Sequence, residues 1–379
     1  MRIELNEDQK LIQESAADFA IKHVKPIAAE LDETQEFPVA LLPKLAEMGF
    51  MGIAVPEEYG GAGLDYVSYV LVMEELARYC GTTSVIVSVN NSLACEPILT
   101  YGTEEQKQEF LTPLASGEKL GCFALTEPNS GSDCGSMKTY AKREGEDWIL
   151  NGAKIFITCA TNAQTAIVFT STNPSQGNRG ITAFIVDMDQ PGVSVKTMHG
   201  KMGIRASGLA EIVFEDVKVP DSNRLGEVDK GFKIAMTTLN AGRIGIAAQA
   251  VGISRGAMEE SIQYSSERQQ FGKPIGKFQA IQFFLADMAV RIDASRLLTL
   301  KACTLKDKGE NYNNLSAMAK LLAGETATWV TNKAVQVHGG YGYIKEYNVE
   351  RYFRDARITE IYEGTSEIQK VVISRELLG

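Results

Sequence analysis

A carboxylate beside a glycine near the C-terminal end is the first candidate for chemistry. In the stretch ITEIYEGTSE, Glu363 precedes Gly364 where a loop would pass into a helix. A carboxylate in an apolar, water-poor site has a raised pKa and becomes a better base. Thr365 or Ser366 could cap the following helix, with Ser366 and Gln369 spaced as a capping box. We therefore predict that Glu363 is a catalytic base, although an isolated Glu-Gly pair is more often a solvated turn.

The cysteines and histidines argue against a metal or redox centre. Six cysteines and three histidines occur, and no two cysteines form a C-x-x-C pair. Zinc and dithiol sites depend on such local clusters, so we expect six reduced thiols and no bound metal. The formal net charge of −10 argues against nucleic acid or an anionic membrane as a partner.

The N-terminal stretch MRIELNEDQK is polar and charged from its start. It has neither the apolar core of a secretion signal nor the pattern of a transit peptide. No apolar run in the chain approaches the roughly 18–20 residues that a spanning helix needs. The sequence predicts a cytoplasmic protein with no membrane partner.

The elements that must position Glu363 fall into three blocks, of which residues 1–120 have helical character. Asn6 and Gln9 have the spacing of a capping box, and apolar residues follow them at helical spacing. The run EEYGGAGLDY contains a Gly-Gly-x-Gly pattern, but no strand precedes it. We expect a loop there and not a dinucleotide-binding turn.

The second block, residues 121–230, changes to strand periodicity. In DWILNGAKIFIT, Asn151-Gly152 separates two apolar runs, which predicts a β-hairpin with a type I′ turn. Further short apolar segments follow, each broken by Gly, Pro or Asn. This pattern predicts a compact β domain.

The third block, residues 231–379, returns to long helices. An apolar stripe at three- and four-residue spacing runs from Phe278 to Ile292. A second helix, about 315–337, ends before a Gly-Gly pair that is typical of a helix C-cap. The sequence thus predicts a mainly α protein with a β middle domain.

Three domains are predicted from these blocks: an N-terminal α-helical domain at 1–120, a middle β domain at 121–230 and a C-terminal α-helical bundle at 231–379. Clefts form where such domains meet, and ligand sites tend to lie in them.

Several segments together resemble one family. They occur in that family's order along nearly the whole chain: LTEPNSGSD, NGAKIFIT, FEDVKVP, GRIGIAAQAVG, ERQQFGKPIGKFQ, QVHGGYGY and IYEGTSE. One such segment would be a weak signal, whereas seven in order are specific. They resemble the acyl-CoA dehydrogenases, and within that family the short-chain, butyryl-CoA-type members.

The resemblance implies an acyl-CoA dehydrogenase-like fold with an α-helical N-domain, a β-barrel-like middle domain and a C-terminal four-helix bundle, usually in a homotetramer. It also implies bound FAD, an acyl-CoA substrate and electron transfer to an electron-transfer flavoprotein. Removing two hydrogens from a saturated thioester requires a base for the α-proton and an acceptor for the β-hydride. No side chain accepts hydride well, so a cofactor must do so. FAD fits this need although the chain has no GxGxxG turn.

The resemblance assigns Glu363 the α-proton and the flavin N5 the β-hydride. Some branched-chain and long-chain members carry the base immediately before the arginine of the GR segment. That position here is Gly242, which leaves Glu363 as the base. The residues that the resemblance places around the substrate or in support of the base are Arg243, Asn240, Ser132 and Gly364. Asn240 stands where related members often have aspartate, which leaves its contact to the CoA arm open.

The resemblance also assigns residues to the flavin. Those expected around its ring and phosphates are Phe123, Leu125, Thr126, Ser132, Phe156, Ile157, Thr158, Thr365 and Glu367. Those expected to reach the adenine dinucleotide of a neighbouring subunit are Arg268, Gln279, Gln336, Gly339 and Gly340. Phe156 would pack on the ring face, although strand alternation also allows it to point into the core. Arg268 suits phosphate as a planar fork of donors, but a surface arginine at a helix end is common.

The segment 82–97, TTSVIVSVNNSLACEP, is expected to line the acyl pocket. It contains no arginine to receive a terminal carboxylate, which disfavours a dicarboxylic substrate such as glutaryl-CoA. Asn91 in this segment is no base, which argues against relatives that form cyclic dienes. A short, neutral acyl chain is the resulting hypothesis.

Two alternative functions remain open at this point. The same fold could run in reverse, as an enoyl-CoA reductase within an electron-bifurcating flavoprotein complex, with identical site residues. The chain could also be a non-catalytic flavin-binding scaffold subunit, although Glu363, Arg243 and Thr158 occur together. An acyl-CoA oxidase fits less well, because oxidases are typically much longer.

Overall fold

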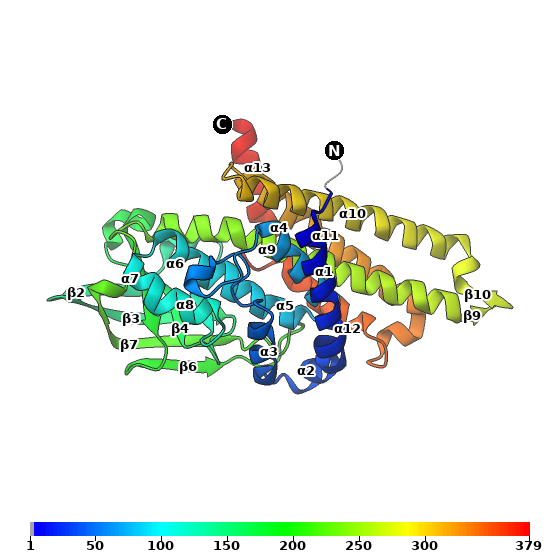
Figure 1. The fold of residues 1–379 in the computed structure, drawn as a ribbon, viewed down its shortest axis with the longest axis horizontal. Coiled ribbons are helices and arrows are strands. Elements are labelled where there is room, and N and C mark those ends of the chain that lie inside the picture. The colour runs from blue at the N-terminus through cyan, green and yellow to red at the C-terminus, as the bar shows by residue number, and fades with distance from the viewer. Residues whose placement is uncertain (1–3) are drawn as a thin grey trace.

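Helices form both ends of the chain and strands form its middle in the computed structural model, which describes residues 4–379 (Figure 1). The sheet lies at one end of an elongated molecule, and the long helices run from it toward the other end. The predicted fold class, mainly α with a β middle domain, is confirmed. The division of the chain at residues 120 and 230 stays a prediction.

The N-terminal region consists of short helices, and two of them, Tyr66–Ala77 and Gly81–Ser88, are buried along their whole length. The capping box predicted at its start is confirmed, because Asn6 Oδ1 accepts from the Gln9 N–H at 2.8 Å and Gln9 Oε1 accepts from the Asn6 N–H at 3.0 Å. The predicted loop at 57–66 contains only a 3₁₀ turn, Glu57–Tyr59. The helices are α1 (Glu7–Phe19), α2 (Ala28–Thr34), α3 (Leu42–Glu47), α4 (Tyr66–Ala77), α5 (Gly81–Ser88), α6 (Glu96–Tyr101), α7 (Glu104–Gln106) and α8 (Thr112–Ala115), with a π-helical segment η5 (Val89–Cys95).

The middle region is one sheet in the order β6-β7-β3-β2-β4-β5-β8, with β1 paired in parallel to β4. Its longest pairing is the antiparallel ladder between β3 and β7. The strands are β1 (Gly121–Ala124), β2 (Tyr140–Glu144), β3 (Asp147–Ile157), β4 (Thr165–Ser171), β5 (Ile181–Asp187), β6 (Val193–Thr197), β7 (Ala210–Pro220) and β8 (Arg224–Leu225).

The hairpin turn predicted at Asn151-Gly152 is wrong, because both residues lie within β3. They mark a β-bulge, where the register with β7 shifts between Leu150 and Gly152. The Asn151 side chain donates to Asp216 Oδ1 and accepts from the Asp216 N–H, both at 3.0 Å. The chain reverses instead between Glu144 and Asp147, which pair across β2 and β3. Pairing with a distant strand therefore overrides the local turn preference of Asn-Gly.

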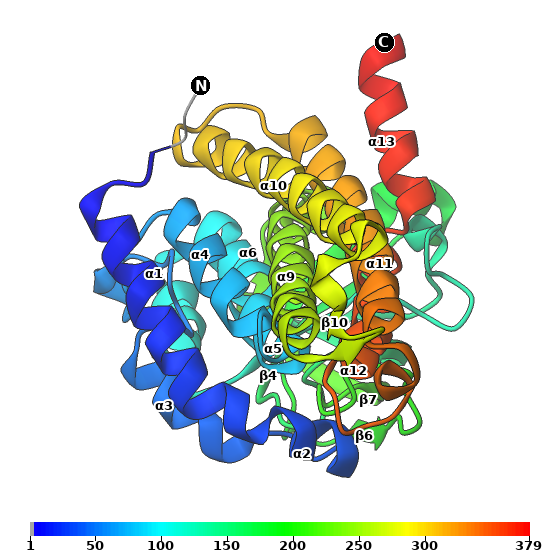
Figure 2. The same cartoon turned by 90° about the vertical axis from the view of Figure 1, so that its right-hand side faces the viewer.

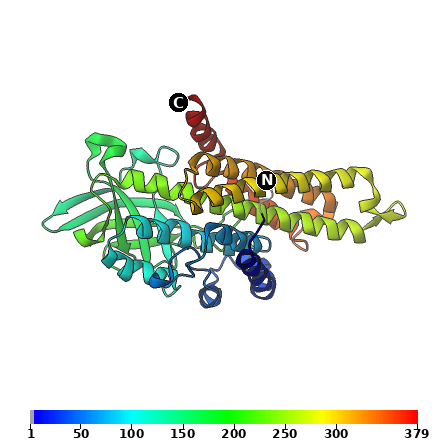
Figure 3. The same ribbon diagram turned by 45° about the horizontal axis from the view of Figure 1, so that its top comes forward.

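The C-terminal region has three long helices that run lengthwise beside one another, and two shorter helices follow them (Figure 3). They are α9 (Gly231–Glu267), α10 (Gln279–Asp307), α11 (Asn313–His338), α12 (Val349–Ala356) and α13 (Ser366–Leu378), with the short hairpin β9 (Gln269–Gln270) and β10 (Lys273–Pro274) after α9. The predicted end of the second helix is confirmed, because Gly339 caps α11 with φ 61°. Of the predicted stripe, Met288 and Ile292 are buried, whereas Phe278 precedes α10. Helix α13 projects from the body of the molecule (Figure 2).

One hydrophobic cluster joins the three regions. It includes Leu93 of η5, Ile157 at the end of β3 and Ile244 of α9, and Tyr362 packs against it. Helices α4 and α9 also pack along each other. The loop that carries Glu363 therefore lies against the core shared by all three regions.

The remaining sequence expectations concern the cysteines, a metal site and a membrane-spanning helix. All six cysteines are free, and five of them are buried. Among residues 4–379, no group of histidine, cysteine, aspartate or glutamate side chains could hold a metal ion. No helix in this part of the chain combines the length and the apolar character needed to cross a bilayer.

Candidate active site

Glu363 lies on a tight bend between a 3₁₀ turn (Arg357–Glu360) and α13. Its φ is 53° and that of Gly364 is 94°, so two consecutive residues have left-handed backbone. Such strain in a residue other than glycine persists where the surrounding structure holds it, and it is frequent at functional sites. Only the second position of this bend is occupied by glycine, so the carboxylate position is the strained one.

The cap of α13 differs in part from the prediction. Thr365 is the N-cap, and its hydroxyl accepts from the Ile368 N–H at 3.4 Å. The Ser366–Gln369 capping box is absent, because Ser366 is already the first residue of the helix and its hydroxyl is buried without a partner. Gln369 Nε2 instead donates back to the Gly364 carbonyl at 2.8 Å. The side chain still stabilises the bend, by a different contact.

The Glu363 carboxylate lies against the backbone of α9 at Gly242. A Cβ atom at Gly242 would lie 2.0 Å from Glu363 Oε2 and 3.1 Å from Leu93 Cδ2. Gly242 therefore leaves the space that the carboxylate occupies. The position where some relatives carry their base thus adjoins the carboxylate of the base predicted here.

Burial dominates the protonation of Glu363. The residue as a whole is half-buried, but its Oε2 atom is shielded from solvent and has no hydrogen-bond partner. Burial raises the pKa of Glu363 to about 8, and the nearby charges of Lys320 and Arg243 oppose this rise. A carboxyl group that titrates near neutral pH can take up a proton during turnover and release it afterwards.

Arg243 is buried on α9, one residue after Gly242. Its Nη1 donates to Asn240 Oδ1 at 2.7 Å, and Asn240 Nδ2 donates to Asn313 Oδ1 at 2.8 Å. The Nε atom of Arg243 is buried without a partner. Asn240 therefore orients Arg243 toward the site, and the contact of Asn240 to a CoA arm stays a prediction.

Sequence reasoning missed Lys320, which is 1% exposed and lies on α11. Its Nζ donates to the Gly364 carbonyl at 2.7 Å. The available signal was a lone lysine among small residues in SAMAKLLAG. It also missed Tyr362, whose hydroxyl donates to Gln249 of α9 and so ties the bend to that helix.

The loop after β1 carries the residues predicted at the flavin ring. Phe123, within β1 itself, is half-buried against the core, Leu125 is buried, and the Thr126 carbonyl accepts from the Ile155 N–H at 2.9 Å. A second buried lysine, Lys154 of β3, holds this loop, because its Nζ donates to the Leu125 carbonyl at 3.0 Å. Ser132, farther along the loop, is exposed. Sequence reasoning missed Lys154 as well.

The end of β3 presents an aromatic face to solvent. Phe156 has φ 60° and is 58% exposed, while Ile157 is buried in the core. Thr158 is half-buried beyond it. Of the two orientations that strand alternation allowed, the Phe156 side chain thus takes the one toward solvent. A strained, exposed phenylalanine next to a hydroxyl suits contact with a flat ring.

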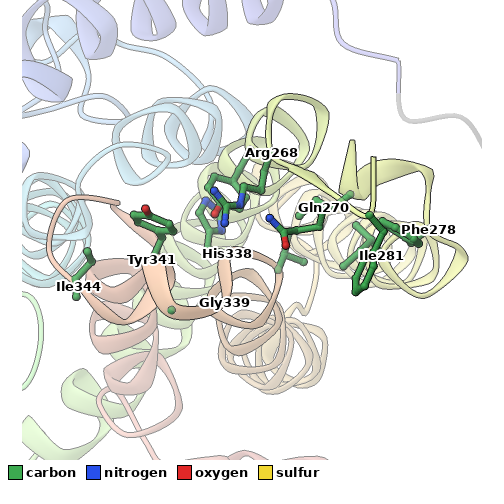
Figure 4. Close-up of a pocket in the computed structure, with 13 residues that line it drawn as sticks. Arg268, Gln270, Phe278, Ile281, His338, Gly339, Tyr341 and Ile344 are labelled. Carbon is green, nitrogen blue, oxygen red and sulfur yellow. The ribbon is translucent and has the colours of Figure 1, made fainter. Parts of the chain in front are cut away.

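Two of the residues predicted for the adenine dinucleotide adjoin the hairpin β9–β10: Arg268 directly precedes β9, and Gln279 begins α10. This hairpin lies at the tip of the helical bundle, away from the sheet (Figure 1). A pocket of about 660 Å³ there is lined by Arg268, Gly339 and Gly340, among others (Figure 4). Arg268 lies over the Tyr341 ring at 5.4 Å. Gln279 and Gln336 are both exposed, and neither of them lines this pocket. The structure therefore separates the two predicted flavin-binding groups, as expected if they serve cofactors of different subunits.

These residues fit a flavin dinucleotide. An isoalloxazine ring needs a flat apolar contact and hydrogen-bonding groups at its edge, which Phe156, Thr126 and Thr158 can provide. A dinucleotide phosphate suits the exposed fork of Arg268. Thr365 and the exposed Glu367 flank the bend that carries Glu363.

The segment predicted to line the acyl pocket is buried beside Glu363. Asn91 uses its side chain in the fold, accepting from the Ile53 N–H at 2.7 Å and donating to Phe50 and Val87 carbonyls, both at 2.9 Å. Part of this segment, Val89–Cys95, is the π-helical η5, and short π-helical turns are frequent at functional sites. Leu93 of η5 lies next to the carboxylate, and η5 contributes no charged residue to this side of the site.

Comparison with known proteins covers the whole described chain. Family models match residues 6–118, 122–217 and 229–378, described as the acyl-CoA dehydrogenase N-terminal, middle and C-terminal domains. A curated relative, the short-chain specific acyl-CoA dehydrogenase of Clostridium acetobutylicum, is 50% identical over 377 residues, covering 100% of both chains.

Two solved structures share the fold over their full length. Butyryl-CoA dehydrogenase from Megasphaera elsdenii has a TM-score of 0.98 at 46% identity, with 100% of each chain covered. A structure from work on the electron transferring flavoprotein of Acidaminococcus fermentans and flavin-based electron bifurcation has a TM-score of 0.98 at 49% identity, again with 100% coverage of each.

Proposed function

This chain belongs to the acyl-CoA dehydrogenase family, and we propose that it oxidises a short-chain acyl-CoA thioester to the trans-2-enoyl-CoA. Members of this family are oxidoreductases that act on CH–CH bonds. The single observation that carries the proposal is the shielded carboxylate of Glu363 in the space that Gly242 leaves open. A carboxylate with these properties can remove a weakly acidic α-proton.

The residues around Glu363 prepare it for this step. Gly242 and Leu93 keep water from Oε2, and the positive charges of Arg243 and Lys320 favour its ionised form. The strained bend fixes the direction of the side chain. Proton transfer by a positioned carboxylate contributes about 10²- to 10⁴-fold to a rate. Glu363 holds the abstracted proton on its carboxylate after the step.

FAD, the cofactor of this family, supplies the hydride acceptor when bound. The ring would be held by Phe156, Thr126 and Thr158, and the loop that bears Thr126 is fixed by Lys154. The adenine half would contact Arg268, Gly339 and Gly340 of a second copy, because these residues lie at the bundle tip. We therefore propose a homo-oligomer, with a homotetramer as the expected form and an electron-transfer flavoprotein as the electron acceptor.

A short, neutral acyl group is proposed because the wall beside Glu363 is closely packed and uncharged. Residues of η5 are all buried, and no arginine occurs between 82 and 97. The relatives in the comparison include enzymes named as short-chain specific and as butyryl-CoA dehydrogenase. A terminal carboxylate would find no cation in this segment.

The test is optical and uses the purified flavoprotein. Butyryl-CoA added under argon is expected to bleach the yellow flavin. Glu363→Gln is expected to keep the flavin and to lower the bleaching rate by about 10²- to 10⁴-fold. A Glu363→Gln protein that bleaches at the wild-type rate would remove Glu363 from the mechanism. In a panel of butyryl-, hexanoyl-, octanoyl- and glutaryl-CoA, preference for octanoyl-CoA would contradict the short-chain proposal.

The reverse reaction is the second candidate, because the Acidaminococcus fermentans match comes from work on electron bifurcation. The same residues would then act on an enoyl-CoA, with Glu363 returning the α-proton. Purification with the partner flavoprotein and an NADH-dependent ferredoxin reduction assay distinguish the two directions. Ferredoxin reduction that requires crotonyl-CoA would support the reductase.

A further inference from the structure

A buried lysine lies directly under the bend that carries Glu363. Lys320 is 1% exposed, and its neighbours on α11, Ala317, Ala319 and Ala323, are fully buried. An ammonium group removed from water costs several kcal/mol unless polar partners compensate it. A lysine retained at such a position therefore needs contacts that offset this cost.

The direct contact of Lys320 is the carbonyl of Gly364, the residue after Glu363. Its Nζ donates to the Gly364 carbonyl at 2.7 Å, and Gln369 Nε2 donates to the same oxygen at 2.8 Å. The two donors come from α11 and α13. They hold the carbonyl that follows two residues with left-handed backbone, Glu363 and Gly364. The strained bend is thus fixed from two helices at one atom.

The charges around the bend form a small, mixed group. Lys320 from α11 and Arg243 from α9 are the cations that act on Glu363. Glu360, at the end of the 3₁₀ turn, and Glu367, in the first turn of α13, act on Lys320. The phenols of Tyr69 on α4 and Tyr362 also face Glu363, and burial raises the pKa of both. They stay neutral, so Lys320 and Arg243 determine the positive potential at the carboxylate.

We propose that Lys320 is a positioning residue for Glu363: its hydrogen bond to the Gly364 carbonyl fixes the bend directly after Glu363, and its charge favours the ionised carboxylate. This inference rests on the proposed role of Glu363 as the base. Lys320 does not touch the substrate. It acts by setting the direction and the protonation of the group that does.

Burial of both groups makes the electrostatic part testable. Burial lowers the pKa of Lys320 to about 8, and the charge of Glu363 opposes that change. The same pair interaction lowers the pKa of Glu363 against the effect of burial. Removing the charge of Lys320 therefore raises the pKa of Glu363, and the rate requires the ionised carboxylate.

Three substitutions separate the hydrogen bond from the charge. Lys320→Gln keeps a donor without a charge, Lys320→Arg keeps a charge and donors, and Lys320→Met removes both. Lys370→Met is the matched control, because Lys370 on α13 forms an exposed ion pair with Glu325 at 3.4 Å. Each variant, loaded with FAD, is assayed with butyryl-CoA for kcat and KM across the neutral and alkaline pH range.

The expected results differ between the variants. Lys320→Met should lower kcat by about tenfold or more with little change in KM, because the base is misplaced. The value of kcat/KM should rise with pH as Glu363 ionises. The midpoint of this rise should lie about one pH unit higher in Lys320→Gln and in Lys320→Met than in the wild type. Lys320→Arg and Lys370→Met should keep the wild-type midpoint. A purely structural lysine would lower activity without moving the midpoint.

A second measurement does not depend on activity. Amide hydrogen exchange in the peptide that spans residues 361–370 should be faster in Lys320→Met than in Lys320→Gln, because only the former loses the donor to Gly364. If Lys320→Met does not fold, Lys320→Gln against Lys320→Arg still decides the charge effect. The inference would be overturned if Lys320→Gln kept the wild-type midpoint and Lys320→Met, where it folds, kept the wild-type exchange rates. A wild-type protein that fails to oxidise any acyl-CoA would instead overturn the proposed function.

Discussion

Two buried lysines hold the two halves of the candidate site, and they are compensated differently. Lys154 donates to the Leu125 carbonyl in the sheet region, and Lys320 donates to the Gly364 carbonyl in the helical region. Lys154 is also paired with Glu127 at 2.9 Å, whereas none of the ion pairs among residues 4–379 includes Lys320.

The partner of Lys154 is itself held by the backbone. Glu127 accepts from the N–H groups of Lys138 at 2.6 Å and Thr139 at 3.0 Å. These contacts and the charge of Lys154 lower the pKa of Glu127 against the effect of burial. Glu127 and Lys154 thus each have hydrogen-bond partners in addition to one another, and these partners compensate both buried charges. Lys320 acts on Glu363, the carboxylate that we propose as the base and whose protonation state would then change, so a permanent ion pair there would oppose turnover.

The largest effect that sharpens this comparison is expected from Lys154→Met. It leaves the buried Glu127 with its two backbone donors but without its counterion, and loss of one partner of a buried ion pair typically costs about 3–5 kcal/mol of stability. Lys320→Met should cost less, under about 2 kcal/mol, because Glu363 can stay protonated. Urea unfolding of both variants measures the difference. Equal losses would show that the two lysines are compensated alike.

The next effect concerns the space beside Glu363. Gly242→Ala would place a methyl group where the carboxylate lies, and the flexible end of Glu363 would move. We expect kcat to fall by about 10- to 100-fold with little loss of stability. Gly242→Ala should lower kcat less in the Glu363→Asp background than in the wild type, since the shorter side chain avoids the methyl group. Additive losses would contradict this geometry.

A smaller effect is expected in the pH dependence of stability. The pKa of Glu363 is raised by burial from 4.5 to about 8 in the folded state. Its contribution to stability is therefore present below about pH 4.5 and is lost as pH rises through about 8. Glu363→Gln should gain stability relative to the wild type across this window, reaching about 1–3 kcal/mol at its upper end. Unfolding midpoints measured at several pH values test this sign, and a constant difference would contradict it.

The smallest effect is expected at an exposed ion pair on β2, the strand that pairs with β3. Lys142 and Glu144 lie 3.5 Å apart with side chains 73% and 58% exposed. Solvent and salt screen such pairs, so Lys142→Met should change the free energy of unfolding by less than about 0.5 kcal/mol. A change as large as that of Lys154→Met would show that burial does not explain the comparison.

Local signals in the sequence predicted the helix ends well. The cap at Asn6 and the glycine at Gly339 are set by neighbouring residues, so their patterns could be read directly. Asn151-Gly152 misled because the partner of that stretch, β7, lies about 60 residues away in the sequence. The two lysines were missed because a charged residue in a regular element usually faces water. Only the packed structure shows that Lys154 and Lys320 do not.

The family resemblance predicted the site residues more fully than the patterns alone. Glu363 is placed as a shielded carboxylate beside Gly242, and Phe156 presents its ring outward. Their roles in catalysis and flavin binding stay proposals until the variants are measured. The contacts of Lys320 and Gln369 with the Gly364 carbonyl were not predicted, because they join three segments that are distant or differently paired in the sequence pattern.

The distance between the sheet and the pocket at the bundle tip has a consequence for purification. A cofactor that bridges two copies couples its own retention to their association, by the reciprocity of linked equilibria. Diluting the protein would then release flavin, and stripping flavin would promote dissociation. Storage at high concentration with added FAD should preserve a yellow, assembled enzyme, and colour lost on dilution should return on reconcentration.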